Sequence, residues 1–408
     1  MTRANKRQFN FQQFNFHINF RRIKALALAI FFLNLFPSFA EVVNDSVYKY
    51  SLDFPEGFVL DDFDPQNGSY FFSHPNIPVC LALVVYKDPN ITDSHFSLEV
   101  ALKKLSGTFD IDQFTWNGSK CAIADFSMTL DQDYAGWAVS APLQNPGAFL
   151  NLICYAPKDK RPVCNQFIMS LLNSLCTNQE YYSTPGIIVT YAFPKEGKKD
   201  VNLNIAGQRI HTNLDKSDLE GANFLIDMEF SVLTLYANHP LKQKAWERYY
   251  RLIYRDSFGR LENCISDVLD VLVPLAMIKS PQNQDLFIAQ TLLSWVQDFD
   301  YKRNNASKSS SDFTSLPATI CGEGNDCDSR SLLICMFMRS MGYESLLLVS
   351  PEFLHALASV EMDAPGQKYV LEGSEREFLI GETTAKVTWG MIAQDFADRS
   401  KWFPVFLP

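Results

Sequence analysis

The sequence predicts a multidomain α+β protein: an N-terminal antiparallel α/β sandwich, a connector with β-strands and a C-terminal α+β domain. Two observations predict this class. Between residues 41 and 177, short segments rich in Tyr, Phe and Val surround one amphipathic helical pattern and are closed by a second. In the last third of the chain, a Gly-rich turn leads into an apolar helical segment, and strand-like segments follow. The length of 408 residues, with 47% hydrophobic and 20% charged residues, suits two or three folded domains.

Residues 1–40 have the order of a secretory signal peptide. Six basic residues and no acidic residue precede the apolar run at 25–36, which ends near the small residues Ser38 and Ala40. We therefore expect cleavage after Ala40 and an exported mature chain, periplasmic or extracellular. A run of twelve apolar residues is too short to cross a bilayer easily, so we expect no stable transmembrane span after cleavage. An uncleaved anchor is the alternative.

The charge and cysteine counts restrict the partners and the chemistry. Without residues 1–40 the chain holds 30 basic and 46 acidic residues, a net charge of −16. Because such a surface repels phosphate backbones, nucleic acid is not expected as a partner. The nine cysteines are an odd number, which leaves at least one thiol free or paired with another molecule.

Residues 41–177 are expected to form the sandwich. One helix should be capped by Thr92 or Asp93, and a closing helix should bury its face at 167–175. An antiparallel sheet backed by two helices is the packing that this order favours. The element order resembles the sandwich of PsbP-like proteins, which implies a packing or ligand-binding module. The predicted strands lie at 47–54, 69–73, 79–86, 114–116, 120–128, 134–141 and 148–155.

Residues 178–237 are expected to be a connector with strands at 186–193 and 201–210, joined by a hairpin loop at 194–199. The apolar run at 222–237 fits either a strand or a helix. Residues 238–408 are expected to hold a helical segment and the C-terminal domain. Three helices are predicted in series, one opening at His239-Pro240, one at 261–273 and one opening at Ser280-Pro281. A polar loop at 302–315 should be exposed.

Cys327 is the strongest candidate for a catalytic group. It follows a turn with Gly322 and Gly324 and begins a nearly apolar segment that ends at Gly342. A helix N-terminus favours thiolate over thiol, and its free N–H groups can bind an oxyanion. The two glycines are expected to let a substrate approach closely. The sequence therefore predicts Cys327 as a nucleophile.

A thiol nucleophile needs a base, and His355 is the only histidine beyond residue 239. His355 begins the strand-like run at 355–360, and Glu382 ends the apolar run at 378–381. Two adjacent strands would place Glu382 beside the imidazole and let it orient the ring.

At these residues the chain resembles the transglutaminase-like superfamily of papain-like thiol enzymes. The similar residues are Gly324…Asp326-Cys327-Asp328, His355-Ala356 and Glu382-Thr383-Thr384. The resemblance covers about residues 285–390 and implies a Cys helix packed on an antiparallel sheet that carries the His and the acid. This sequence departs from the family pattern in having Glu where Asp is usual, and two residues between Gly324 and Cys327 where one is commoner.

The resemblance also implies residues around the thiol. Trp295 and Tyr301 fall where the family has an aromatic-bearing helix, so either would line the cleft or donate to the oxyanion. Gly324, Asp326 and Asp328 are the further candidates for contact with substrate or oxyanion.

We expect an exported thiol enzyme that hydrolyses or transamidates amide bonds of a peptide or protein substrate, without a cofactor. The alternative is a non-catalytic envelope or binding protein that retains the fold. A metal site is not expected, because Cys321, Cys327, Cys335 and His355 lack paired Cys-x-x-Cys spacing.

Other residues of these types are expected to be structural. Cys264 and Cys335 should be buried thiols. An aromatic stripe at helical spacing should form core and rim rather than a binding surface. The stripe consists of Trp246, Tyr249, Tyr250 and Tyr254.

Overall fold

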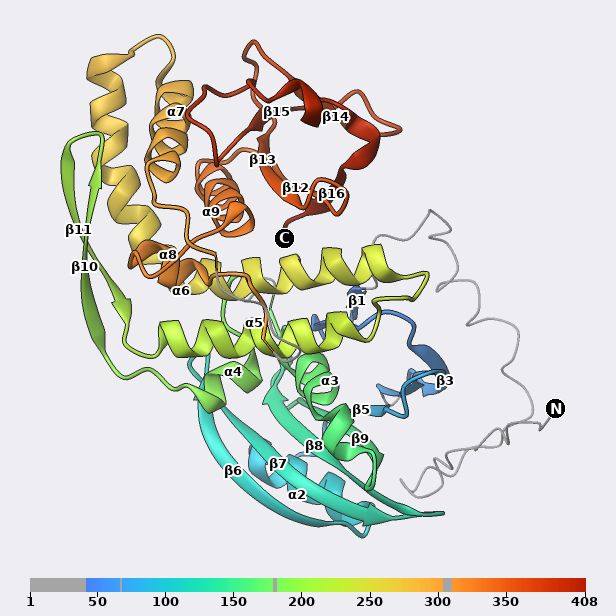
Figure 1. Ribbon diagram of the computed structural model, residues 1–408. Coiled ribbons are helices and arrows are strands. Elements are labelled where there is room, and N and C mark those ends of the chain that lie inside the picture. Colours follow the sequence, from blue (N-terminus) through green and yellow to red (C-terminus); the bar gives the residue numbers. More distant parts are fainter. Residues whose placement is uncertain (1–41, 67, 179–181, 304–309) are drawn as a thin grey trace. The chain divides into compact units, whose positions relative to one another are not determined.

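The computed structural model describes residues 42–408, except residue 67, residues 179–181 and residues 304–309 (Figure 1). The predicted signal peptide, residues 1–40, lies outside the described residues. The chain folds as two units, Met1–Gln179 and Glu180–Pro408, each with its own sheet and helices. The structure thus has the mixed α+β, multidomain character that the sequence predicts. In the described part of the chain, every helix is too short or too polar to cross a membrane.

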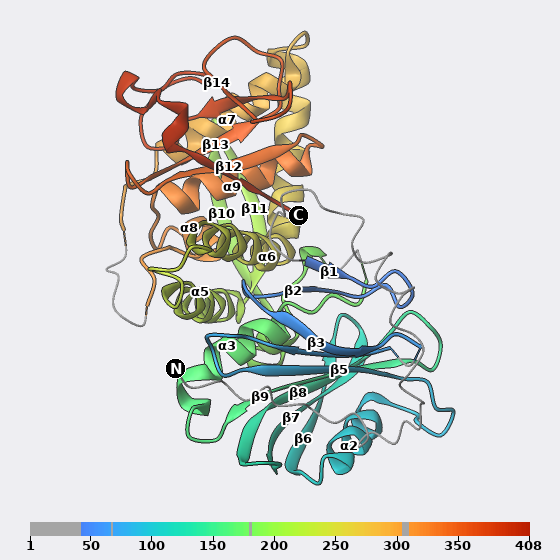
Figure 2. The same ribbon diagram turned by 90° about the vertical axis from the view of Figure 1, so that its right-hand side faces the viewer.

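The N-terminal unit contains a seven-stranded antiparallel sheet in the order β3-β4-β5-β9-β8-β7-β6, which can be followed in Figure 2. A short pair, β1 (Val42–Asn44) and β2 (Ser51–Asp53), stands apart from it. The sequence did not predict β3, whose three aspartates disfavour a strand. The sheet strands are β3 (Val59–Asp64), β4 (Ser69–Ser73), β5 (Cys80–Tyr86), β6 (Thr108–Trp116), β7 (Ser119–Thr129), β8 (Asp133–Pro142) and β9 (Phe149–Pro157).

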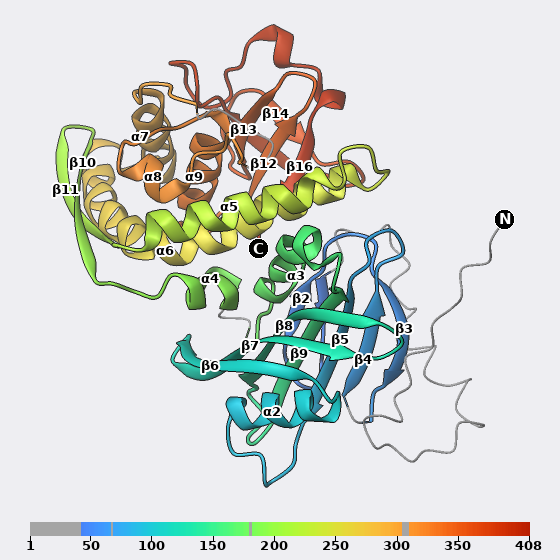
Figure 3. The ribbon, with the colours of Figure 1, turned by 60° about the horizontal axis from the view of Figure 1, so that its bottom comes forward.

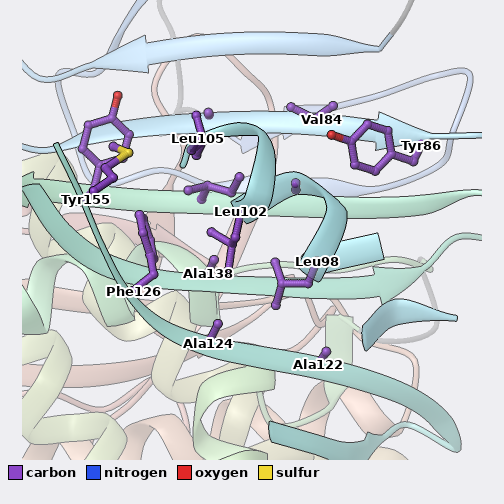
Figure 4. Close-up of a cluster of buried hydrophobic side chains, with 14 of the residues drawn as sticks. Val84, Tyr86, Leu98, Leu102, Leu105, Ala122, Ala124, Phe126, Ala138 and Tyr155 are labelled. Carbon is purple, nitrogen blue, oxygen red and sulfur yellow. The ribbon is translucent and has the colours of Figure 1, made fainter. Parts of the chain in front are cut away.

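Two helices cover opposite faces of this sheet (Figure 3). Helix α2 (Ser94–Lys104) begins at the predicted cap Asp93 and packs its leucines on the face that carries Phe126 (Figure 4). Helix α3 (Arg161–Asn173) covers the other face, where Arg161 forms an ion pair of 2.6 Å with Asp125. The predicted antiparallel sheet with two backing helices is therefore confirmed.

The connector differs from the prediction in two places. Residues 187–192 form helix α4 (Ile187–Ala192) and not a strand, because burial of Ile187, Ile188 and Val189 in one turn overrides their strand preference. The hairpin turn lies at Ala206-Gly207, both with positive φ, and not at 194–199. It joins β10 (Lys198–Ile205) to β11 (Gln208–Asp215).

The helices that follow are longer than predicted. The run at 222–237 belongs to helix α5 (Asp218–Thr234). The first two helices predicted after it are one helix, α6 (Lys242–Lys279), which buries a continuous stripe that includes Ile253, Leu261 and Val268 and continues through Pro274. The third is helix α7 (Gln284–Gln297).

The predicted exposed loop at 302–315 is exposed only in part. Ser311 and Phe313 to Ser315 are buried before helix α8 (Leu316–Ile320), because their backbone groups bond to the core of this unit. The prediction is therefore wrong for these residues, while residues 304–309 lie outside the description.

The candidate site lies between helix α9 (Cys327–Ser340) and a five-stranded antiparallel sheet in the order β14-β15-β13-β12-β16 (Figure 1). Helix α9 packs on β12 and β13. The strands are β12 (Ser345–Ser350), β13 (His355–Val360), β14 (Lys368–Val370), β15 (Glu377–Gly381) and β16 (Phe403–Phe406). Two single turns, η3 (Gln394–Phe396) and η4 (Arg399–Lys401), precede β16.

All nine cysteines are free thiols in this structure. Cys264 and Cys335 are fully buried, as predicted. The aromatic stripe of α6 is also core and rim as predicted, with Tyr249, Tyr250 and Tyr254 buried and Trp246 half-buried.

Candidate functional site

Asp326 directly precedes helix α9 and is its N-cap. Its Oδ1 accepts a hydrogen bond of 2.7 Å from the Ser329 backbone N–H, and the Ser329 hydroxyl accepts one of 2.9 Å from the Asp326 N–H. Its Oδ2 accepts a bond of 3.2 Å from the Thr314 N–H. Because both oxygens face backbone donors and the residue is buried, Asp326 acts here as a helix cap and not as a substrate contact.

Backbone conformation and packing in the turn before α9 account for Gly322 and Gly324 without a bound substrate. Gly322 has φ +75° and lies exposed, a backbone conformation in which a side chain is strained. Gly324 is buried, and a Cβ there would lie 3.3 Å from the Lys302 carbonyl oxygen. The space beside Gly324 is thus filled by the protein, contrary to the expectation that it admits substrate.

Cys327 is the first residue of α9 and is 3% exposed. Its Sγ donates a hydrogen bond to Asp328 Oδ1 at 3.2 Å. Burial raises the pKa of the Cys327 thiol well above its ordinary value, the carboxylates of Asp328 and Asp326 raise it further, and the backbone of Ala356 lowers it. The expectation that the helix N-terminus makes Cys327 a thiolate is therefore wrong for this state, because burial and two carboxylates outweigh the helix dipole.

Asp328 links the thiol to helix α6. Its Oδ2 accepts a hydrogen bond of 2.8 Å from the Tyr250 hydroxyl, while its Oδ1 faces Cys327. Burial raises the pKa of Asp328, and burial together with the Asp328 charge raises the pKa of Asp326 to about 7. Near neutral pH, this pair therefore retains a proton that isolated carboxyl groups would have lost.

His355 and Glu382 come together as their strands predict. β13 pairs with β15 in the register Ala358↔Gly381, which places the first residue of β13 near the residue after β15. His355 Nε2 lies 2.9 Å from Glu382 Oε2. Glu382 Oε1 accepts bonds of 2.7 Å from both the backbone N–H and the hydroxyl of Thr384. Burial tends to raise the pKa of Glu382, but the bonds from His355 and Thr384 outweigh it and leave the pKa below its usual value.

The imidazole is held from its faces as well. The ring of Phe396 lies 5.2 Å from that of His355 and the ring of Trp402 lies 6.2 Å away, measured between centroids. The His355 side chain is about one-tenth exposed. Its Nε2 is engaged by Glu382, so Nδ1 is the nitrogen left for a proton transfer.

The two predicted aromatic candidates have different surroundings. Trp295 is buried, with its ring 6.1 Å from that of Phe337, which lies ten residues along α9 from Cys327, a rise of about 15 Å. Trp295 is therefore a core residue rather than part of a cleft at the thiol. Tyr301 is half exposed, stacks over Arg330 at 5.4 Å, and interacts electrostatically with Cys327.

Sequence reasoning gave no role to Arg330 or Gln297 and placed Tyr250 only in the core and rim, yet all three contact the site. Arg330 bonds to the Thr383 carbonyl oxygen, and Gln297 Nε2 donates 2.8 Å to the Glu382 carbonyl oxygen. A charged residue inside an apolar helical segment was the available signal for Arg330. Nothing local marks Tyr250 or Gln297, because their partners lie 78 and 85 residues away.

Among the described residues, no group of three or more His, Cys, Asp or Glu side chains is placed to hold a metal ion. The ionisable groups at the start of α9 instead bond to one another and to the protein.

No family model matches the chain. A human relative, WD repeat- and FYVE domain-containing protein 4, is 29% identical over an alignment of 167 residues that covers 39% of this chain. The aligned stretch spans only 5% of that relative's length.

Two of the solved structures with weak similarity each match about a third of the chain. The cyanobacterial PsbP of Synechocystis sp. PCC 6803 matches 34% of this chain and 91% of its own, at 11% identity and a TM-score of 0.29. LpqN of Mycobacterium tuberculosis, described as involved in cell envelope biogenesis, matches 33% of this chain and 85% of its own, at 14% identity and a TM-score of 0.25.

Proposed function

We propose that the C-terminal unit is a thiol enzyme that cleaves or exchanges amide bonds of a peptide or protein. The observation that carries the proposal is the 2.9 Å contact between His355 Nε2 and Glu382 Oε2, at the strand end next to Ala356, whose backbone interacts with the Cys327 thiol. The proposal takes Cys327 as the nucleophile, His355 as the base and Glu382 as the acid that orients the base, and three separate segments contribute them.

The proposed chemistry assigns one task to each group. The Cys327 sulfur attacks the amide carbonyl carbon while His355 Nδ1 takes the thiol proton, and the carbon–nitrogen bond breaks as His355 protonates the leaving amine. A thioester on Cys327 results. Water then releases an acid, or a second amine releases a new amide, and the thiol is regenerated. Glu382 stabilises the imidazolium that forms in each half.

The arrangement of the elements supports an assignment to the transglutaminase-like superfamily. Its resemblance implies a Cys helix packed on an antiparallel sheet that carries the His and the acid, and α9, β13 and the end of β15 have that relation. The export of the chain, proposed from residues 1–40, would place this activity on a substrate outside the cytoplasm.

A second candidate is a non-catalytic binding protein, and the state of Cys327 favours it. The thiol is 3% exposed and donates to Asp328, so a substrate reaches it only if its surroundings move. If the protein is an enzyme, the buried state of the Cys327 thiol is a resting state that opens to substrate. If it is a binding protein, the thiol stays buried permanently.

Hydrolysis of generic substrates separates the two candidates. The purified mature chain is assayed with peptide p-nitroanilides and p-nitrophenyl esters, with and without an added primary amine. Cys327→Ala should lower kcat/KM by roughly three to six orders of magnitude, while Cys335→Ala on the same helix stays within about threefold. Equal rates for the wild type and Cys327→Ala would exclude the enzyme and leave the binding protein.

A further inference from the structure

The buried guanidinium of Arg330 lies among the groups of the candidate site. Arg330 is 2% exposed and occupies the fourth position of α9, three residues after Cys327. Residues three apart on a helix share a face, with their Cβ atoms about 5–6 Å apart. The guanidinium therefore lies on the side of α9 that carries the thiol.

Arg330 holds three segments through three different nitrogens. Its Nη1 donates to the Thr383 carbonyl oxygen at 3.1 Å, its Nη2 to the Phe299 carbonyl oxygen at 2.7 Å, and its Nε to Asn325 Oδ1 at 2.7 Å. Thr383 directly follows Glu382, so one of these bonds fixes the backbone next to the acid.

The bonds of Arg330 are made with neutral oxygens, which leaves its charge to act on the site. A buried cation interacts strongly with nearby anions, because little water screens it. Arg330 interacts electrostatically with Tyr301, Asp326, Cys327 and Glu382. The two carboxylates of Asp326 and Asp328 disfavour a thiolate at Cys327. Arg330 is a fixed positive charge on the same helix, and it favours the thiolate.

We propose that Arg330 is a positioning residue that fixes the Glu382 segment against helix α9 and favours the anionic form of Cys327. The inference rests on the proposed function for the role of Cys327. It assigns to Arg330 an electrostatic effect that a purely structural arginine would not have.

The test is the pH dependence of Cys327 alkylation by iodoacetamide, measured by peptide mapping on the full mature chain. The other charged or ionisable groups that interact with this thiol remain unchanged in every variant; they are Asp326, Asp328, Tyr250, Tyr301 and Arg303. The paired His355 and Glu382 also remain unchanged. Thermal unfolding of each variant establishes that it is folded at the assay temperature.

Arg330→Gln removes the charge and should slow alkylation of Cys327 about tenfold or more at pH 8, with the pH profile moved to higher pH. Arg330→Lys cannot make the three bonds but keeps the charge. Because the charge is what favours the thiolate, its rate of Cys327 alkylation should stay within about threefold of the wild-type rate. Arg339→Gln is the matched control, since it removes a charge near the far end of α9 and should change the rate less than twofold.

The inference is overturned if Arg330→Gln alkylates within twofold of the wild type, or if Arg330→Lys is as slow as Arg330→Gln. If Arg330→Gln does not fold, the alkylation rate of Arg330→Lys alone tests the inference, with the same threefold limit. A purely structural role predicts that this variant also loses alkylation rate, because lysine cannot make the three bonds. The assay needs no substrate. A failed amidase assay with the expected alkylation pattern therefore contradicts only the proposed function. A successful amidase assay without the expected alkylation pattern contradicts only the inference on Arg330.

Discussion

Helix α9 buries two cysteines, Cys327 at its first residue and Cys335 eight residues later, and their surroundings differ. Cys335 is fully buried, its thiol lies 3.4 Å from the Leu346 carbonyl oxygen, and burial raises its pKa to about 11. Cys327 is buried as well, but Asp326, Asp328 and Arg330 stand within one turn of it.

The comparison shows that burial alone does not identify a functional thiol. Burial raises the pKa of both thiols, and only one of them lies where charged groups from separate segments converge. Placing several ionisable groups together in the interior is costly, so a chain that does so usually uses them. The start of α9 at Cys327 is therefore the part of the helix that we connect with chemistry.

Apart from loss of the nucleophile itself, the largest effect should come from the acid that orients His355. Glu382→Gln keeps the size of the side chain but removes the charge that stabilises imidazolium, so kcat/KM should fall by roughly two to four orders of magnitude. Glu382→Asp should cost about tenfold, because the site is built for one more methylene. The measurement is hydrolysis of a generic ester or amide.

Glu377→Gln is the matched control for Glu382, because Glu377 is the exposed first residue of β15, the strand that Glu382 follows, and pairs with Lys368. Its activity should stay within about twofold. If Glu382→Gln keeps full activity while Cys327→Ala is inactive, the proposed roles of the thiol and the base stand, and the role given to Glu382 is wrong.

A smaller effect should appear in the pH dependence of stability. The pKa of Asp326 is about 7 in the fold and ordinary in the unfolded chain, so its contribution to stability is full below about pH 4 and lost as the pH rises through 7. The unfolding free energy of the wild type should fall by on the order of 2–4 kcal/mol over that window. Asp326→Asn should abolish most of this fall.

Urea unfolding at several pH values measures this, and Asp298→Asn is the control, because the Asp298 side chain is exposed in an ion pair with Lys386. Parallel pH profiles of the wild type and Asp326→Asn would mean that the carboxyl groups at the start of α9 do not share a proton.

The smallest effect concerns the stability contributed by the two thiols. Cys335→Ala removes a sulfur from a closely packed apolar site and should lower the free energy of unfolding by about 1–2 kcal/mol. Cys327→Ala should lower the free energy of unfolding by less than about 1 kcal/mol, because burial and the neighbouring carboxylates already disfavour the ionised form of this thiol. Urea unfolding of both variants at pH 7 compares them, and a larger cost at Cys327 would show that its thiol is mainly structural.

Much of this arrangement could be predicted from local patterns. Asp93 was predicted as a cap because it precedes a helical pattern, and the start of α9 at Cys327 followed from the Gly-rich turn before an apolar segment. The positions of His355 at a strand start and of Glu382 after the next long strand followed from alternation and chain order.

The remainder depends on tertiary contacts that the sequence does not reveal. The ionisation of Cys327 is governed by burial, which no single segment shows, and Tyr250 reaches Asp328 from a different helix. Helix α4 was mistaken for a strand because its β-branched residues prefer strands, although packing decided otherwise. The turn at Ala206-Gly207 was missed because alanine seldom adopts positive φ.

The central claim is that Cys327 acts as a nucleophile with His355 as its base, and trapping of the acyl-enzyme tests it most directly. The mature chain is mixed briefly with p-nitrophenyl acetate at neutral pH, quenched in acid, and mapped by peptide mass spectrometry. The account predicts one acetyl group on Cys327, formed at least about tenfold more slowly in His355→Ala and absent from Cys335. An acetyl group spread evenly over several thiols, or a rate on Cys327 that His355→Ala leaves unchanged, would contradict it.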